Sequence, residues 1–538
     1  MLLRRLHSSA PRRTAAVAPW RTLHGAAPNY RRMILEARVY DVARHTPLQH
    51  APALSDVLQN RVYFKREDLQ PVFSFKIRGA YNKMASLSDA QKRAGVVCCS
   101  AGNHAQGVAL SAKRLGVSAT IVMPLATPEI KVQSVRQHGG ESVSIVLHGK
   151  TFDEAAAEAK RIEAEEQRTM ILPFDDPYVI AGQGTIGLEI LQQTSGEQLD
   201  AIFVCCGGGG MLAGIAAWVK QIRPSVKVIG VEAADAAGMT ASLVAGQRIE
   251  LDHVGLFADG AAVKLVGKET FRVCQQYVDE MVTVSTDEIC AAIKNSFNDT
   301  RVILEPAGAL AIAGLTQYAQ RRGLTGCTFA AVTSGANIDF ARLRFVSERA
   351  DSRERLLSVQ IDERPGSFRQ LYHHLDRAGV RLTEFSYRFS DPKKALIYMS
   401  FQSPSPDGAT RAIEQLQTNG YDVLDLSFNE LAKVHMRHLV GGKRPARADG
   451  EEDAAPERLY RFEFPDRPGA LRTFLDQLQR DWNISLFHYR NHGADVGRVL
   501  VGFQVPRADE QRFQTYLEQL ACRYHDETDD AMYKELLL

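Results

Sequence analysis

The chain has 538 residues, of which 45% are hydrophobic and 24% are charged, the balance of an ordinary globular protein. Its formal net charge of +2 gives no indication of a nucleic-acid or anionic-membrane partner, and we expect neither. No apolar run approaches the roughly 18 residues that a membrane-spanning helix needs, while the length favours about three or four domains.

The first segment of the chain differs from the rest in composition. Residues 1–30 are rich in Arg, Ser, Thr and Ala, and the first acidic residue of the chain is Glu36. An arginine-rich start without acidic residues is typical of a mitochondrial transit peptide, although a disordered basic tail would have the same composition. We therefore expect the mature protein to lie in the mitochondrial matrix.

Short apolar runs alternate with helical patterns between about residues 60 and 345. The run "AGVVCCS" leads into "NHAQGVALSAKRLGV" and then "ATIVMPL", and "AIFVCC" leads through glycines into "MLAGIAAWVKQI" and "VKVIGVEA". Strands that alternate with helices predict parallel sheets with helices on both faces. The polar stretch Asp153–Glu166 predicts a surface helix.

The eight cysteines do not have the C-x2-C spacing of zinc sites. Cys98-Cys99 and Cys205-Cys206 lie in apolar runs that read as buried strands, and the other four are scattered. This pattern predicts reduced core residues in a non-oxidising compartment.

The last third of the chain repeats itself. "LLSVQIDERPGSF" (Leu356–Phe368) matches "LYRFEFPDRPGAL" (Leu459–Leu471), and "FSYR" with "FHYR" and "LIYMSFQSP" with "VLVGFQVP" follow in the same order. Such spacing indicates a duplicated unit of about 85 residues. Each copy reads as strand, helix, strand, strand, helix, strand, an order that favours a ferredoxin-like fold, with Pro-Gly in the first turn of the first helix.

The expected boundaries follow from these patterns. Residues 31–348 form the first domain, residues 354–440 and 457–538 form the two repeated domains, and residues 441–456, rich in Gly, Pro and charge, form a flexible linker.

Four consecutive glycines, Gly207–Gly210, follow a predicted buried strand and precede a helix. Backbone amides in such a loop can surround an anion at the helix N-terminus. The loop lacks the Lys-Ser/Thr of a P-loop and the pattern of a dinucleotide fingerprint, so a single compact phosphate group fits it best. A tight packing turn is the alternative.

Two further segments also place polar groups after strands. "SAGNHAQG" (Ser100–Gly107) offers amides and the side chains of Ser100 and Asn103 to a carboxylate, although an ordinary capped helix would look the same. "VTSGAN" places Ser334 at the carboxyl end of a strand, where open α/β sheets bind ligands.

Lys76 stands among Phe73, Phe75 and Ile77 in "FSFKIRGA". A lysine in an apolar setting has a lowered pKa and becomes a nucleophile and base, as a Schiff-base lysine must. Beside a compact phosphate site it has the arrangement that a pyridoxal 5′-phosphate (PLP) enzyme needs. Taken alone, a surface lysine remains the alternative. We expect Arg78-Gly79 to form the turn into the next helix.

The segments "SFKIRGA", "SAGNHAQG", "CGGGGM" and "TSGAN", in this order, resemble the tryptophan-synthase-β-like, fold-type II PLP enzymes, and among these the threonine dehydratase family. The resemblance covers residues 35 to 345, and the repeats resemble ACT-like regulatory domains. It implies an α/β catalytic domain of two open parallel-sheet subdomains, followed by two ferredoxin-like α+β domains.

The resemblance also implies roles for individual residues. Lys76 would tether PLP and later remove the α-proton of the substrate, Phe75 would pack against the cofactor ring, and Ser334 would face the pyridine nitrogen. Asn103 would hydrogen-bond the 3′-oxygen of the cofactor. The amides that would bind its phosphate belong to Gly207, Gly208, Gly209, Gly210 and Met211. The residues that would hold the substrate carboxylate are Ser100, Ala101, Gly102, Asn103 and His104.

By the same resemblance we expect deamination of L-threonine, and of L-serine, to 2-oxo acids and ammonia, with 2-oxobutanoate from threonine as the first step of isoleucine biosynthesis. Isoleucine would inhibit through the repeated domains, valine would oppose it, and the enzyme would be a homotetramer. Glu305 would either line the site or only begin a helix. Related metal-dependent enzymes have a carboxylate six residues after the position of Glu232, where this chain has Gly238, so we expect no metal.

Two alternatives stay open at this point. A serine racemase or a catabolic serine/threonine dehydratase would share the four segments but would lack the repeated tail. An inactive amino-acid sensor with the same fold would be expected to have lost Lys76 or the glycines, which this chain retains.

Overall fold

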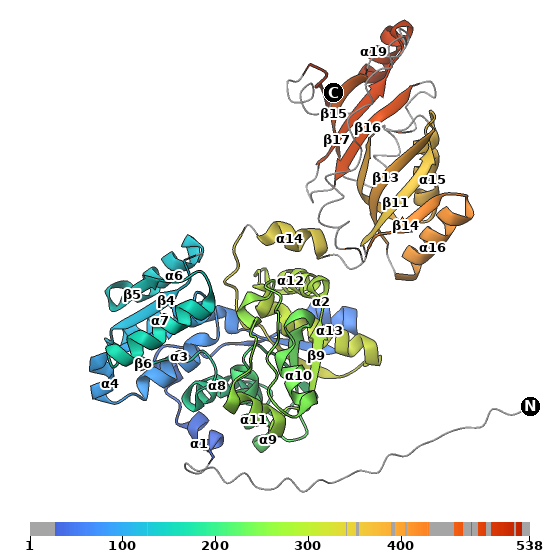
Figure 1. Ribbon diagram of the computed structural model, residues 1–538. Helices are drawn as coiled ribbons and strands as arrows, with labels where there is room; N and C mark the ends of the chain where they lie inside the picture. The colour runs from blue at the N-terminus through green and yellow to red at the C-terminus, as the bar shows by residue number, and fades with distance from the viewer. Residues whose placement is uncertain are drawn as a thin grey trace, which may run out of the picture. The chain divides into compact units, whose positions relative to one another are not determined.

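The computed structural model describes residues 27–125, 127–340, 342–350, 354–388, 393–403, 406–427, 429, 457–465, 475, 482–490, 496–520 and 523–529. The chain divides into two compact units, Met1–Ala350 and Asp351–Leu538 (Figure 1). The expected transit peptide, up to residue 26, the expected linker at 441–456 and Cys522 lie outside the described residues.

The larger sheet of the first unit has six strands in the order β1-β2-β10-β7-β8-β9. All neighbours are parallel except β1 and β2, which are antiparallel. The strands are β1 (Leu48–His50), β2 (Arg61–Lys65), β7 (Ala201–Cys205), β8 (Lys227–Ala233), β9 (Glu280–Val284) and β10 (Thr328–Val332). The central strands β7 and β10 are buried along their whole length, as continuous apolar runs predict for a parallel sheet covered on both sides.

Two helices cover opposite faces of this sheet. A Cβ placed on Gly230 of β8 would meet Leu212 of α9 (Gly210–Ile222), whereas the next residue, Val231, contacts Gly314 of α13 (Pro306–Arg322). Because successive residues of a strand point to opposite faces, α9 and α13 lie on opposite sides. The expected sheet with helices on both faces is therefore confirmed.

The smaller sheet has four parallel strands in the order β5-β4-β3-β6. They are β3 (Val96–Cys99), β4 (Ala119–Met123), β5 (Val143–Leu147) and β6 (Thr169–Met170). The expected surface helix is α7 (Phe152–Glu165), one residue earlier than predicted at each end, because Thr151 and Glu154 form a capping box that sets its first turn. We call this sheet with its helices the small lobe and the six-stranded part the large lobe.

The remaining helices of the first unit are α1 (Tyr30–Leu35), η1 (Val39–Asp41), α2 (Pro52–Leu58), η2 (Glu67–Leu69), α3 (Lys76–Ala85), α4 (Asp89–Ala94), α5 (Asn103–Leu115), α6 (Glu129–Gly139), η3 (Gly140–Ser142), α8 (Pro177–Gln193), η4 (Ala234–Ala236), α10 (Gly238–Ala245), η5 (Asp259–Ala261), α11 (Lys268–Tyr277), α12 (Thr286–Thr300) and α14 (Arg342–Arg349). No helix in the described part of the chain is long and apolar enough to cross a membrane.

A network of buried charges joins β2, η2, α3 and α8. Arg78 directs all five of its N–H groups to acceptors, among them both oxygens of Glu67 at 2.7 Å and Glu189 at 2.6 Å. Lys65 directs all three of its N–H groups to Glu189 at 2.5 Å, the carbonyl of Thr46 at 2.6 Å and a glutamine. Burial alone would raise the pKa of Glu189, but Arg78 and Lys65 lower it to about 2. The network is therefore charged, paired and fully hydrogen-bonded.

The second unit is one antiparallel sheet in the order β14-β11-β13-β12-β16-β17-β15-β18. The first copy comprises β11 (Glu354–Asp362), α15 (Ser367–Arg377), β12 (Arg381–Arg388), β13 (Lys394–Gln402), α16 (Pro406–Thr418) and β14 (Asp422–Asp425). The second copy comprises β15 (Glu457–Pro465), β16 (Asn483–Arg490), β17 (Val496–Gln504), η7 (Arg507–Asp509), α19 (Glu510–Gln519) and β18 (Arg523–Asp526). The strand order 4-1-3-2 recurs in both copies, which confirms the ferredoxin-like prediction.

The two copies meet through β12 and β16, which pair antiparallel from Glu384 opposite Arg490 to Arg388 opposite Leu486. The expectation for Pro365-Gly366 was wrong, because α15 begins only at Ser367. Gly366 has φ +88° and so makes the bend before the helix instead of its first turn. The corresponding Pro-Gly of the second copy lies outside the described residues.

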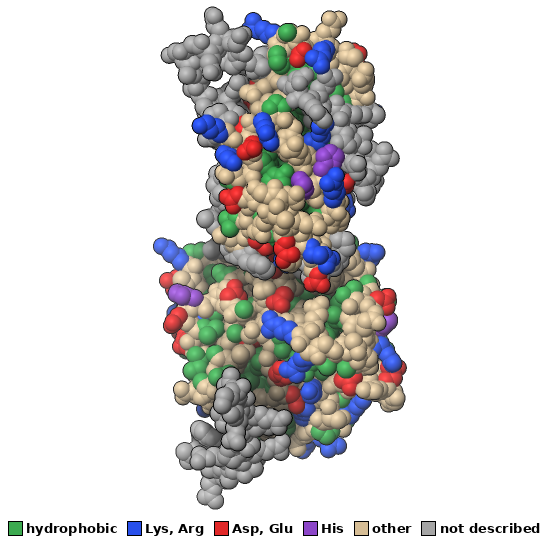
Figure 2. Space-filling view, turned by 90° about the vertical axis from the view of Figure 1, so that its right-hand side faces the viewer, with side chains coloured by type: hydrophobic (Ala, Val, Ile, Leu, Met, Phe, Trp, Pro, Cys, Tyr) green, Lys and Arg blue, Asp and Glu red, His purple; other side chains and the backbone are tan. Residues whose placement is uncertain are grey.

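The surface carries both signs of charge. In the face seen in Figure 2, Lys and Arg side chains are interspersed with Asp and Glu on each unit, in keeping with the net charge of +2.

Candidate active site

One cavity of the first unit brings together nine of the predicted site residues. They come from the start of α3, the start of α5, the loop between β7 and α9, and the segment after β10. The predicted residues that line the cavity are Phe75, Lys76, Asn103, Gly207, Gly208, Gly209, Gly210, Met211 and Ser334. The cavity therefore lies at the carboxyl ends of β7 and β10, the position at which open parallel sheets bind ligands.

The segment before Lys76 is fixed to the segment after β10. Phe73 has φ +53°, the left-handed region that a phenylalanine rarely adopts, and its carbonyl accepts a hydrogen bond from the amide of Ala336 at 2.9 Å. Ser74 forms an isolated β-bridge with Gly335. These contacts determine where the next helix, α3, begins.

The expectation that Arg78-Gly79 forms a turn was wrong, because α3 already begins at Lys76 and contains both residues. A Cβ on Gly79 would overlap the side chain of Gln183 and lie 2.8 Å from Val179 on α8. The glycine is needed for the close packing of α3 against α8, and the pattern Arg-Gly alone did not distinguish packing from a turn.

The amine of Lys76 donates a hydrogen bond to the carbonyl of Pro173 at 2.9 Å and lies 5.3 Å from the centre of the Phe75 ring. Burial lowers the pKa of Lys76 from 10.5 to about 8. A substantial fraction of this amine is therefore neutral near physiological pH, as a nucleophile or base requires.

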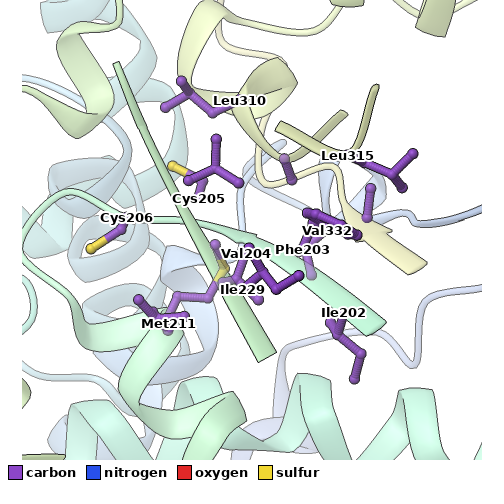
Figure 3. Close-up of a cluster of buried hydrophobic side chains, with 14 of the residues drawn as sticks. Ile202, Phe203, Val204, Cys205, Cys206, Met211, Ile229, Leu310, Leu315 and Val332 are labelled. Atoms are coloured by element: carbon purple, nitrogen blue, oxygen red, sulfur yellow. The ribbon is translucent and has the colours of Figure 1, made fainter. Parts of the chain in front are cut away.

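The glycine loop is closely surrounded. A Cβ on Gly208 would overlap the ring of Phe174, and one on Gly207 would lie 2.9 Å from the backbone of Ala261 in η5. Gly209 has φ +93°, which glycine adopts without strain. The loop thus needs glycine both for its backbone conformation and for close packing, and its four glycines line the cavity at the start of α9. Figure 3 shows Cys205, Cys206 and Met211 at this junction of β7 and α9.

Ser334 follows β10 and is 2% exposed. Its hydroxyl donates to the carbonyl of Ala307 at 3.3 Å. Because a hydroxyl hydrogen rotates, the same group can instead donate to an acceptor in the cavity. The neighbouring thiol of Cys205 is neutral, because burial raises its pKa to about 12. Both side chains are therefore uncharged at this end of the cavity.

Asn103 is hydrogen-bonded on both sides of its amide. Its Nδ2 donates to Glu305 at 2.6 Å, and its Oδ1 accepts from Asn337 at 2.8 Å. Glu305 lines the cavity and also directly precedes α13, so it does more than begin a helix. Burial raises the pKa of Glu305 to about 7.

The other four residues predicted to hold a carboxylate do not line the cavity. Ser100 accepts a hydrogen bond from the amide of Gly102 at 3.3 Å. His104 donates from Nε2 to the carbonyl of Ile171 at 2.8 Å, and burial lowers its pKa to about 3. The ring of His104 is therefore neutral. That residues 100–104 hold the substrate carboxylate stays a prediction.

Several lining residues had not been identified from sequence. Phe174, Gln183 and Gly260 come from loops and helices without a recognisable pattern. Asn337, which closes the quoted segment "TSGAN", does not line the cavity but donates a hydrogen bond to Asn103, which does. Glu232, from which the position of Gly238 was counted, accepts hydrogen bonds from the amides of Met239 and Thr240 at 2.8 and 2.9 Å.

Comparisons with known proteins agree over both units. A family model described as a pyridoxal-phosphate dependent enzyme matches residues 39–335, and one described as the C-terminal regulatory domain of threonine dehydratase matches residues 346–436 and 450–537.

Two relatives match almost the whole chain. The biosynthetic L-threonine dehydratase IlvA of Burkholderia multivorans is 52% identical over 516 residues, 95% of this chain and 100% of the relative. The mitochondrial threonine dehydratase of Saccharomyces cerevisiae is 48% identical over 527 residues, 95% of this chain and 89% of the relative. Among solved structures, the processed form of threonine deaminase isoform 2 from Solanum lycopersicum has a TM-score of 0.58 at 50% identity and covers 60% of this chain and 92% of its own.

Proposed function

The chain belongs to the pyridoxal-phosphate-dependent enzymes and, among them, to the biosynthetic threonine dehydratases, and on this basis we propose that it deaminates L-threonine to 2-oxobutanoate and ammonia. The observation that carries the proposal is similarity over both units, including the regulatory segment. A serine racemase or a catabolic dehydratase was expected to lack that segment, so the regulated biosynthetic enzyme is favoured.

The residues of the cavity fit PLP. The closely surrounded loop Gly207–Gly210 at the start of α9 suits a compact phosphate, since side chains are excluded and amides remain. Lys76 supplies an amine of lowered pKa, Ser334 a neutral hydroxyl and Asn103 an amide donor at the same cavity. We propose these as the groups that hold the phosphate, the aldehyde carbon, the pyridine nitrogen and the 3′-oxygen, with Met211 and Phe75 completing the site.

When bound, PLP withdraws electrons from the substrate α-carbon and so acidifies its proton. The neutral fraction of Lys76 takes that proton, because its lowered pKa leaves the amine free to act as a base. The hydroxyl of Ser334 cannot stabilise charge at the pyridine nitrogen as a carboxylate would. This environment favours prompt loss of the β-hydroxyl over transfer of the amino group.

The decisive experiment is a 2-oxobutanoate assay of the purified protein with L-threonine, with L-serine in parallel. We expect a yellow protein that forms 2-oxobutanoate, and a Lys76→Ala variant that has lost both the colour and the turnover. A colourless wild-type protein, or an active Lys76→Ala variant, would contradict the assignment. A yellow but inactive wild-type protein would favour the sensor.

We also propose that the second unit binds isoleucine as an inhibitor, with valine opposing it. Support comes from a cavity between the two copies, lined by the turn 361–366 of the first copy, by Phe368 and by residues 482–484 of the second. Glu363 accepts hydrogen bonds there from Tyr387 at 2.5 Å and from Asn483 at 3.1 Å. A carboxylate beside aromatic walls suits an amino acid with a branched apolar side chain.

Removal of one cavity wall tests this site. Trp482→Ala should leave turnover without effector near the wild-type value and weaken inhibition by isoleucine about tenfold or more, since a buried aromatic contact is lost. Leu424→Ala, which changes an apolar side chain 61% exposed on β14, is the control. Unchanged inhibition by isoleucine in Trp482→Ala would show that the effector binds outside this cavity.

Localisation and assembly complete the proposal. The composition of residues 1–30 and the mitochondrial relative support import into mitochondria, although a bacterial relative matches equally far. A fluorescent protein fused to residues 1–35 should enter mitochondria. We propose a homotetramer, for which light scattering should give about four times the chain mass of 59.5 kDa, less the removed peptide.

A further inference from the structure

Three polar side chains form a chain of hydrogen bonds that crosses from one lobe to the other beside the cavity. Asn337, after β10, and Glu305, before α13, belong to the large lobe, whereas Asn103 begins α5 in the small lobe. Asn337 donates to Asn103 at 2.8 Å, and Asn103 donates to Glu305 at 2.6 Å. Asn103 is therefore held from two sides by the opposite lobe.

The orientation of Asn337 is fixed first. Its Nδ2 donates one hydrogen bond to the carbonyl of Val72 at 2.9 Å and another to Oδ1 of Asn103. An amide nitrogen has two N–H groups, so both are used. Because a backbone carbonyl can only accept, Asn337 cannot reverse its amide without losing both bonds.

The orientation of Asn103 follows from that of Asn337. If the Asn103 amide were reversed, its Nδ2 would face the Nδ2 of Asn337, and its Oδ1 would face a carboxyl oxygen of Glu305. In the observed orientation one N–H of Asn103 is bonded to Glu305, and the structure records no protein acceptor in its described part for the second. Asn103 lines the same cavity as Lys76.

Glu305 can reach Asn103 because its surroundings are shaped for it. It is 6% exposed, and a Cβ on Gly335 would overlap its carboxyl group, so the glycine of "TSGAN" makes room for it. The amide of Glu305 also donates to the carbonyl of Gly335 at 3.2 Å. The carboxyl is thus placed by the same segment that carries Asn337.

We infer that Asn337 and Glu305 are positioning residues that hold the second N–H of Asn103 toward the cofactor. This inference rests on the proposed function, in which that N–H meets the 3′-oxygen of PLP. Because both partners of Asn103 belong to the large lobe, the orientation of this donor depends on residues from both lobes. A donated hydrogen bond favours the ionised 3′-oxygen and lowers the pH at which the bound cofactor changes its absorption.

The test uses the purified holoenzyme and an Asn337→Asp variant. The substitution places a carboxylate oxygen against Oδ1 of Asn103, so the Asn103 amide turns and the cofactor loses its donor. We expect the absorption change of the bound cofactor to move upward by about one pH unit and its affinity to fall about tenfold, the value of one hydrogen bond. Glu305→Leu should move the absorption change in the same direction.

A double variant separates positioning from general damage. Asn103→Ala should produce the same shift, and Asn103→Ala combined with Asn337→Asp should add nothing to it, because Asn337 acts through Asn103. Asn60→Asp is the matched control, since Asn60 is 6% exposed and donates to two carbonyls at the opposite end of the sheet. The midpoint of thermal unfolding is measured for each variant together with its spectrum, so that a loss of stability is recognised.

Additive shifts, an unchanged spectrum in Asn337→Asp, or an equal shift in Asn60→Asp would overturn the inference. If Asn337→Asp does not fold, Glu305→Leu against Glu305→Gln decides, because glutamine retains an acceptor for Asn103 and should restore the wild-type midpoint. Failure of the proposed function is distinguishable, since it would appear in wild-type protein as absent cofactor or absent turnover of threonine.

Discussion

Replacement of Lys76 by methionine measures the free energy that burial of its amine costs the fold. The ordinary lysine pKa of 10.5 is lowered to about 8 in the cavity, a difference equivalent to about 3 kcal/mol. Because the cavity partly exposes the side chain, this figure is an upper value. Methionine fills similar space without a charge, so the cofactor-free variant should be more stable than the cofactor-free wild-type protein.

The lowered pKa of Lys76 determines how the stability difference between Lys76→Met and the wild-type protein changes with pH. Between pH 8 and 10.5 the unfolded wild-type chain binds a proton at Lys76 that the folded chain does not, so wild-type stability rises with pH in that window. The advantage of Lys76→Met should be complete below pH 8 and shrink above it, from about 3 kcal/mol at pH 7 to roughly half that value at pH 9.5.

Lys65→Met is the matched control, because Lys65 is also buried but is paired with Glu189 at 2.5 Å. Its removal should destabilise by about 3–5 kcal/mol, the cost of breaking a buried ion pair. Urea unfolding at pH 7 and pH 9.5 measures the free energy of unfolding of the cofactor-free wild-type protein, Lys76→Met and Lys65→Met. An advantage of Lys76→Met that is absent at pH 7, or identical at pH 9.5, would refute the lowered pKa of Lys76.

Three further outcomes are expected. Gly208→Ala should weaken cofactor binding at least tenfold in absorbance titrations because its Cβ overlaps an aromatic ring, whereas Gly238→Ala, whose nearest neighbour is 3.5 Å away, should bind normally. A chain ending at Ala350 should retain formation of 2-oxobutanoate and no longer respond to isoleucine; inhibition of the truncated protein would place the effector in the first unit. Asp259→Asn removes the ion pairs of η5 with Lys131 of the small lobe, at 2.8 Å, and with Arg342, at 3.4 Å, and should raise the KM for threonine a few-fold at low salt, with the difference fading as salt rises. A difference that persists at high salt would contradict that reading.

The parts of the site that lie next to each other in sequence could be predicted from it. The run "AIFVCC", four glycines and "MLAGIAAWVKQI" contain the strand, the loop and the helix that form the glycine loop, because hydrophobic pattern and glycine act locally. The duplication was also readable, since the same apolar periodicity recurs at a constant offset. These features need no knowledge of how distant segments pack.

The missed features depend on contacts between distant segments. Phe174 and Ala261 meet the glycine loop only after three separate parts of the chain have packed together. The role of Gly79 is decided by Gln183, about a hundred residues away, and Arg-Gly reads equally well as a turn. The role of Asn337 depends on its hydrogen bond to Asn103, which lies in the opposite lobe. Local sequence has no signal for such partners.

Because β12 and β16 pair within one chain, the response to an effector should not depend on how much of the protein is present. Two such domains on separate chains would dissociate on dilution, whereas these two copies are joined in one polypeptide and experience an effective concentration of about millimolar or more. The cavity between them is then complete in a single molecule. Sensitivity to a small effector should therefore be the same in a cell that makes little of this protein as in one that makes much.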